Sequence, residues 1–136
     1  MRNNYLYMIL IIFTFFSCSF KPKYLEQMNN QFSLNVKKES VSVIYEKETW
    51  GPNGDGFYVA KLSFKNRIDV QEILNQRNFN SLPIKEDLPI SEIHQELNYL
   101  TKGFYLVRID KNDPRDFEIV VIDSNNNELT FYYQLY

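Results

Sequence analysis

Three short apolar segments that follow one another near the C-terminus, residues 104–109, 117–122 and 129–135, constrain the fold most. They are joined by stretches rich in Asn, Asp and Pro, residues 111–115 and 123–127. Such residues pre-set φ or tolerate left-handed conformations, so they favour tight turns between strands. The pattern therefore predicts a meander of antiparallel strands. Residues 117–122 are apolar at nearly every position, which predicts a buried central strand.

Two further segments, residues 40–46 and 57–64, alternate between apolar and polar positions and predict two more strands. The first would place Val41, Val43 and Tyr45 on one face. Residues 49–56 hold three of the four glycines and predict the loop of a hairpin. Ten tyrosines and eleven phenylalanines also favour strands over helices.

The middle of the chain predicts two short helices. Asp69 is a suitable N-cap for a helix that reaches Arg77, and Ser91 for a second helix that ends before Gly103. The predicted fold class is α+β: a mainly antiparallel sheet of about five strands with two short helices on one face, in the order ββ-αα-βββ.

The N-terminus carries a different pattern. Arg2 precedes an uninterrupted apolar run of 12 residues, 5–16, and the chain becomes polar again at Lys21. A run of this length is shorter than the roughly 20 residues that a spanning helix needs. A positive start, a short apolar run and small residues at its end are typical of a secretory signal peptide.

This segment resembles the signal of a bacterial lipoprotein, in which a small residue precedes a cysteine that becomes the lipidated N-terminus. Ser17 and Cys18, the only cysteine, hold those positions. The resemblance implies a membrane partner through acyl chains on Cys18 (a diacylglycerol and an amide-linked chain such as palmitate), and a location in the cell envelope facing outside the cytoplasm. Two alternatives remain open: cleavage and free secretion, or retention of the apolar run as an anchor.

The predicted organisation is a signal peptide over residues 1–17, a lipidated cysteine and polar tether over 18–38, and one α+β domain over 39–136. Removal of 17 residues from 136 leaves 119, enough for one core. The mature part has 14 basic and 17 acidic side chains without a basic cluster, so no nucleic-acid partner is predicted. One cysteine allows no internal disulfide.

Residues 48–58, 102–110 and 117–133 resemble a family of small uncharacterised bacterial proteins. These have a Gly-Asp-Gly segment before an aromatic strand and a tyrosine-rich closing hairpin. The family has histidines before the Gly-Asp-Gly, where this chain has Trp50 and Asn53. Because the family has no established activity, the resemblance implies a fold and leaves function open.

Four residues are candidates for partner binding. Trp50, the sole tryptophan, and Asp55 belong to the glycine-rich loop, and an exposed tryptophan on a loop is a good anchor for a partner. Tyr132 and Tyr136 alternate with the expected core positions of the last strand and are predicted to be exposed. The alternative for Trp50 is that its ring folds back over the core.

Two acidic segments resemble cation sites in part. Residues 123–127 match the first three ligand positions of an EF-hand loop, but Glu128 and Gln134 replace the glycine and glutamate required later. A turn is therefore predicted there. Asp110, Asp113 and Asp116 share one loop, where a solvated turn is the simpler interpretation.

Catalytic patterns are scarce. His94 is the only histidine and no cysteine remains in the folded part, so neither a zinc site nor a Cys-His pair can be built. No catalytic residue, metal or cofactor is predicted. The sequence favours a non-catalytic binding or accessory module of the cell envelope, perhaps protective or inhibitory toward a toxin or hydrolase. The alternative is a hydrolase acting on envelope material through carboxylates such as Asp55 and Asp110.

Expression in a bacterial host with labelled fatty acid tests the anchor. We expect label in the native chain and none in Cys18→Ala, because the thiol is the acceptor. An unlabelled, soluble mature protein outside the cytoplasm would contradict lipidation, and an unprocessed membrane-bound chain would indicate a retained anchor.

Overall fold

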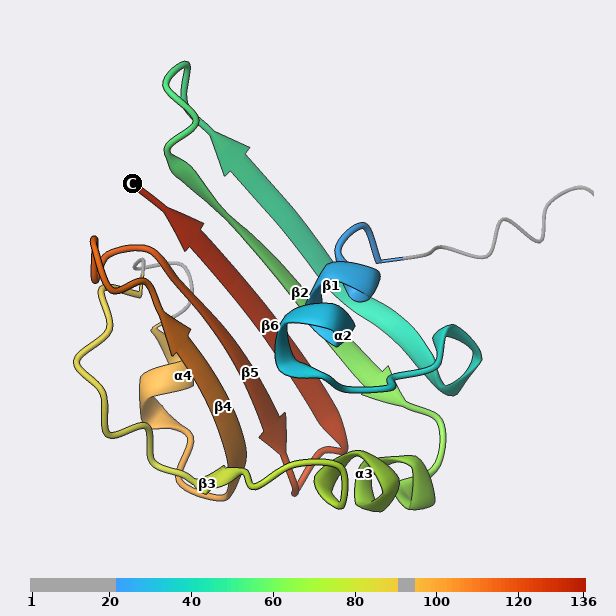
Figure 1. Ribbon diagram of the computed structural model, residues 1–136. Coiled ribbons are helices and arrows are strands. Elements are labelled where there is room, and N and C mark those ends of the chain that lie inside the picture. The colour runs from blue at the N-terminus through green and yellow to red at the C-terminus, as the bar shows by residue number, and fades with distance from the viewer. Residues whose placement is uncertain (1–21, 91–94) are drawn as a thin grey trace, which may run out of the picture.

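The computed structural model describes residues 22–90 and 95–136, which form one antiparallel sheet with short helices (Figure 1). The strands stand in the order β1-β2-β6-β5-β4-β3. Their bounds are β1 Val41–Trp50, β2 Gly56–Phe64, β3 Asn80–Ser81, β4 Gly103–Ile109, β5 Phe117–Asp123 and β6 Glu128–Leu135. The helices are α2 Leu25–Phe32, the 3-10 helix η1 Lys38–Ser40, α3 Arg67–Leu74 and α4 Glu96–Tyr99. The α+β class and the five predicted strands are confirmed; β3 was not predicted.

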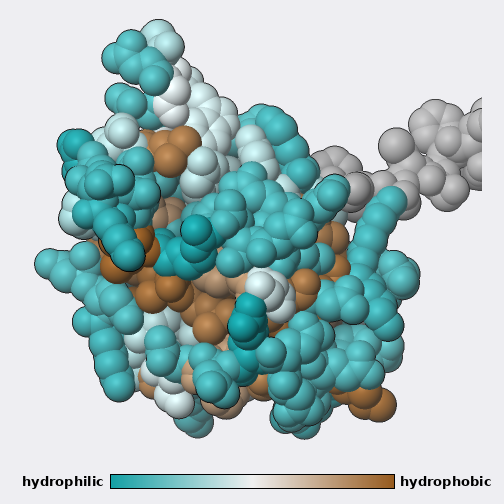
Figure 2. Space-filling model, viewed as in Figure 1, coloured by the Kyte–Doolittle hydropathy of each residue, from teal (hydrophilic) through white to brown (hydrophobic). Residues whose placement is uncertain are grey.

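Both faces of the sheet are covered. All seven residues of β5 are buried, which fits its place between β6 and β4. On one face, buried side chains of α2 and α3 pack against alternate residues of β2, β5 and β6. On the other face, residues 82–97 pack against the intervening residues of the same strands. Figure 2 views the α2 face, where hydrophobic side chains show among polar ones near its centre.

The prediction that both helices lie on one face is wrong. Val70 and Ile73 of α3 join the core beneath α2, whereas Leu97 of α4 joins the opposite core. Leu82 and Ile90, in the proline-containing stretch between these helices, are buried in the same core as Leu97. The chain therefore changes faces between α3 and β3. Residues 91–94, including the predicted cap Ser91, lie outside the described residues.

The polar tether predicted over residues 18–38 is, from residue 22 onward, part of the folded domain. Leu25, Met28 and Phe32 recur at the spacing of one helical face and are all buried. Ser33 then takes a left-handed conformation, with φ of 52°, and the chain turns back so that Leu34 and Val36 are buried as well. The many polar residues of this segment occupy the outer side of α2.

A β-bulge at Ile44 changes the alternation of β1. Val43 pairs with Leu62 of β2, but Tyr45 pairs with the next residue, Lys61, so Ile44 has no partner of its own. One extra residue moves every later side chain to the other face. Tyr45 therefore does not share the face of Val41 and Val43, as the sequence predicted. Glu46, Glu48 and Trp50 come to the α2 face in its place.

The turn between β5 and β6 is the predicted one. Asp123 accepts hydrogen bonds from the backbone nitrogen of Asn125, at 2.8 Å, and from Nδ2 of Asn126, at 2.9 Å. Asn127 has a φ of 54°, a conformation that asparagine tolerates. The carboxylate that would begin an EF-hand loop thus closes a hairpin turn.

Met28→Ala tests whether α2 belongs to the domain. Met28 is 1% exposed, so its truncation should lower the free energy of unfolding by about 2–5 kcal/mol. Glu26→Ala, on the exposed side of the same helix, should change it by less than about 0.5 kcal/mol. Equal, negligible effects in urea titrations would mean that this segment is a tether.

Candidate functional site

The structure brings three of the predicted site residues to one end of the sheet. Trp50 is the last residue of β1, Asp55 immediately precedes β2, and Tyr136 follows β6 (Figure 1). The loop from β4 to β5 lies at this end too, because β4 and β6 run antiparallel to β5. Cys18 and His94 lie outside the described residues.

Trp50 packs against the domain. Its ring centroid lies 5.9 Å from that of Tyr133 on β6, and its Nε1 donates a hydrogen bond to Oε2 of Glu48 at 3.3 Å. The ring is half-buried at the edge of the core beneath α2, which is the folded-back alternative. Asp55 is exposed at the loop, whose ends are joined by the Gly51 nitrogen and the Asp55 carbonyl oxygen at 2.6 Å.

The prediction that Tyr132 is exposed is wrong. The side chain is 0% exposed, and its ring is stacked between Phe57 and Phe117 at centroid distances of 5.9 and 5.5 Å. Its hydroxyl donates to Oε1 of Gln134 at 2.6 Å. The cause is the second covering layer, which the sequence analysis did not place on this face. Tyr136 is 55% exposed, as expected.

The bulge in β1 creates an attachment point for the segment before α2. Lys23 donates from Nζ to both carboxylate oxygens of Glu48, at 2.9 and 2.8 Å, and from its backbone nitrogen to Glu46 at 2.8 Å. Glu46 also accepts the hydroxyl proton of Tyr58. The Lys23 ammonium, and next the Trp50 indole, hold the pKa of Glu48 below its usual value. Burial, and next the hydrogen bond to Glu46, raise the pKa of Tyr58.

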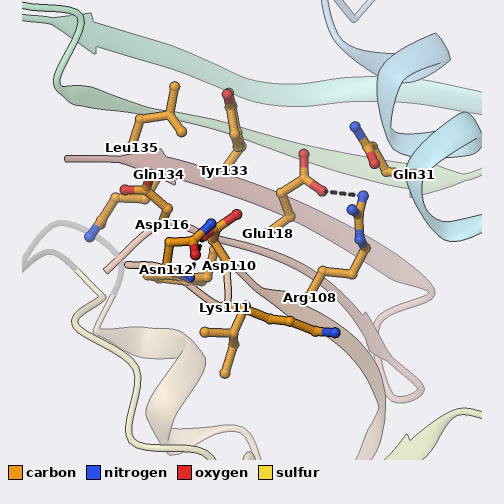
Figure 3. A pocket seen from close by; sticks show the side chains of 12 residues that line it. Gln31, Arg108, Asp110, Lys111, Asn112, Asp116, Glu118, Tyr133, Gln134 and Leu135 are labelled. Carbon is orange, nitrogen blue, oxygen red and sulfur yellow. Dashed lines mark hydrogen bonds and ion pairs between the residues drawn. The ribbon is translucent and has the colours of Figure 1, made fainter. Parts of the chain in front are cut away.

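A groove of about 500 Å³ lies on the α2 face near the same end of the sheet (Figure 3). Its volume is within the range of roughly 300–1,000 Å³ that is common for ligand sites. Its walls come from α2, the three central strand ends and the loop between β4 and β5. They are Gln31, Arg108, Ile109, Asp110, Lys111, Asn112, Asp116, Phe117, Glu118, Tyr133, Gln134 and Leu135.

The floor of the groove is a buried carboxylate. Glu118 on β5 is 8% exposed; its Oε2 pairs with Nη1 of Arg108 at 3.1 Å, and its Oε1 accepts a hydrogen bond from Gln27 of α2 at 3.2 Å. The Arg108 side chain is 52% exposed, so it also faces solvent. A buried charge needs such partners, and here they fix the guanidinium in place.

The rim of the groove carries both signs of charge. Lys111 is exposed. Asp110 accepts the backbone N–H groups of Asn112 and Asp113 through Oδ1, at 2.7 and 3.2 Å, and Asp116 accepts that of Tyr136 at 2.6 Å. Within the described residues, no hydrogen bond joins the second oxygen of Asp110 or Asp116.

The sequence analysis missed the groove. The signal it offered was Glu118, a charged residue within the most apolar strand segment. A carboxylate at a buried strand position requires a partner, but that partner could not be named, because Gln27 and Arg108 lie far apart in sequence and meet only through the packing of α2.

The acidic loop does not gather its carboxylates around one point. Asp113 forms a two-pronged ion pair with Arg115, at 2.9 and 2.6 Å, and this guanidinium lowers the pKa of Asp113 to about 2. Asp110 and Asp116 are engaged with backbone groups. Among residues 22–90 and 95–136, no three His, Cys, Asp or Glu side chains are arranged to hold a metal ion.

The carboxylates proposed for a hydrolase lie apart. Asp55 precedes β2 and Asp110 follows β4, and β6 and β5 stand between these strands. Three strand spacings separate them by about 14 Å. Paired carboxylates in glycoside hydrolases lie roughly 5–9.5 Å apart, so these two do not form such a pair.

Comparison with protein-family models, with curated proteins and with solved structures gives no match. The family resemblance and the lipoprotein signal therefore stay predictions. Within the described residues, none of the helices has the length and apolar character needed to cross a membrane.

Acid titration of Trp50 fluorescence tests the Lys23–Glu48 contact. Because the pKa of Glu48 is lowered, the stability it contributes is present above pH 4.5 and is lost as the pH falls through its lower folded value. Emission should change with a midpoint below 4.5, while far-ultraviolet circular dichroism keeps its native shape. Glu48→Gln should abolish this transition; an unchanged transition would assign it to another group.

Proposed function

We propose that this protein is an exported, lipid-anchored binding module of the cell envelope that holds a peptide segment of a partner protein in the groove between α2 and the β4–β5 loop. The observation that carries the proposal is the groove itself, whose polar floor is fixed by Glu118, Arg108 and Gln27. Groups held in place before binding lose little conformational entropy when a ligand arrives.

The chemistry of the groove favours binding over catalysis. Both oxygens of Glu118 are engaged, one with Arg108 and the other with Gln27, so the carboxylate has no free lone pair aimed at a substrate proton without breaking a contact. Asp55 and Asp110 stand too far apart to work as a pair. The arrangement is a rigid surface of donors and acceptors, which supports recognition.

Mixed charge at the rim indicates the character of the partner segment. Arg108 has donors besides Nη1, and Lys111 adds a second cation, which suits an acidic side chain or a chain terminus. Asp110 and Asp116 suit a basic side chain. Tyr133 adds an aromatic wall, which continues into Trp50. A peptide carrying both acidic and basic side chains matches these groups.

Export and anchoring rest on the apolar run 5–16 and on Cys18, the acceptor of the lipid. A binder held at the envelope in this way suits a protective or inhibitory role, in which the partner is a toxin or an envelope hydrolase. Trp50 then acts as a wall beside the groove rather than as a projecting anchor.

Lys111→Glu against Lys102→Glu tests the groove. Both lysines are exposed and the charge change is identical, but Lys111 lines the groove and Lys102 precedes β4 at the other end of the sheet. We expect Lys111→Glu to reduce recovery of a partner from solubilised envelopes about tenfold, as expected for loss of a charged contact, and Lys102→Glu to leave it unchanged.

The same partner recovered equally with both variants would contradict the groove as the binding site. Urea titration of each variant serves as the control for folding, since both substitutions lie on the surface and should shift stability by no more than about 0.5 kcal/mol.

A further inference from the structure

We infer that the outer edge of the sheet, at the bulge of β1, rests on the lipid surface to which the protein is anchored. The inference depends on the proposed lipidation of Cys18. It assigns an orientation to the domain: β1 lies toward the bilayer, and the edge formed by β3, β4 and α4 lies away from it.

The first argument is the length of chain between the lipid and the domain. Pro22 is buried, and Lys23 is fixed to Glu46 and Glu48 of β1. Four peptide steps join Cys18 to Pro22, and a fully extended chain of this length reaches about 14 Å. The lipid is therefore held close to the attachment point on β1.

The width of the sheet turns this short reach into an orientation. β4 stands four strand spacings from β1, about 19 Å away, and α4 packs near that far edge (Figure 1). Because the reach from Pro22 is shorter than this width, the side of the sheet that carries β1 must lie nearest to the acyl chains.

The second argument is the surface found at that edge. Ile44 and Tyr45 are 51% and 39% exposed, next to each other on β1. The bulge is the cause, because Ile44 is the extra residue and has no partner on β2. Isoleucine gains from contact with acyl chains, and tyrosine prefers the boundary between lipid and water.

Charge at the same edge agrees with this contact. Lys37, Lys38 and Lys65 are exposed, and the backbone nitrogen of Lys65 donates to Ser40, just before β1, at 2.9 Å. Glu39 is the acid among them. A net positive group beside exposed apolar side chains suits a bilayer that contains anionic headgroups.

A lipid surface explains this edge better than an added strand does. A bulge in an edge strand twists it away from regular pairing, and charged side chains such as Lys47 discourage a second strand. The outer edge of β1 is thus poorly suited to extending the sheet, whereas its exposed side chains are suited to an interface.

Ile44→Cys against Tyr99→Cys tests the orientation. Both sites are exposed, Tyr99 lies on α4 at the far edge, and lipidation of Cys18 leaves the new thiol as the reactive one. Each full-length lipidated variant is labelled with a small fluorophore and placed in phosphatidylglycerol-containing vesicles with spin-labelled lipid. We expect the quenching at position 44 to exceed that at position 99 by about threefold, because the interfacial layer extends only ~5–10 Å.

The outcomes separate the two proposals. Fatty-acid labelling of the same samples reports the anchor. An anchored protein with equal quenching at both positions would overturn the orientation and leave the lipidation intact. A disulfide-linked dimer through position 44, without quenching, would also overturn it, because the edge would then contact a second copy. Absence of the fatty-acid label would overturn both.

Discussion

The sheet of this protein depends on the burial of β5 from both sides. Ile119 and Val121 point into one core and Val120 and Ile122 into the other, and all four are 0–1% exposed. An antiparallel sheet commonly leaves one face in water, but a central strand that is apolar at every position cannot. Two covering layers are therefore obligatory. One is the N-terminal segment with α3, and the other is the stretch from Leu82 to α4.

One unpaired residue in β1 then decides the properties of the sheet edge. Without the bulge at Ile44, Glu46 and Glu48 would point away from α2, and Lys23 would lose its partners on β1. The bulge also leaves Ile44 exposed. The attachment of the N-terminal segment and the proposed lipid-facing edge thus have a common structural origin.

The sequence predicts the strands well because their signals are local. Alternation and turn chemistry lie within a few residues, as in the Asp123–Asn127 turn, where the side chain of Asp123 bonds its own loop. The bulge has no comparable signal, since Val43, Ile44 and Tyr45 are all acceptable strand residues. Missing it placed Tyr45 on the wrong face.

Long-range packing accounts for the other errors. α2 was read as a tether because its few apolar residues recur only at helical spacing within a polar segment. Tyr132 was expected in solvent because nothing local shows that residues 82–97 cover that face. The groove was missed for the same reason, since Gln27 and Arg108 meet only at Glu118.

The groove exists only while α2 is docked, because Gln27 holds its floor and Gln31 forms one wall. Native-state hydrogen exchange measures that docking most directly. The account predicts that amides in the last turn of α2 exchange with an opening free energy close to that of β5, because both belong to one cooperative core. Rapid exchange throughout α2 beside a protected β5 would contradict it, since the N-terminal segment would then not be a layer of the fold.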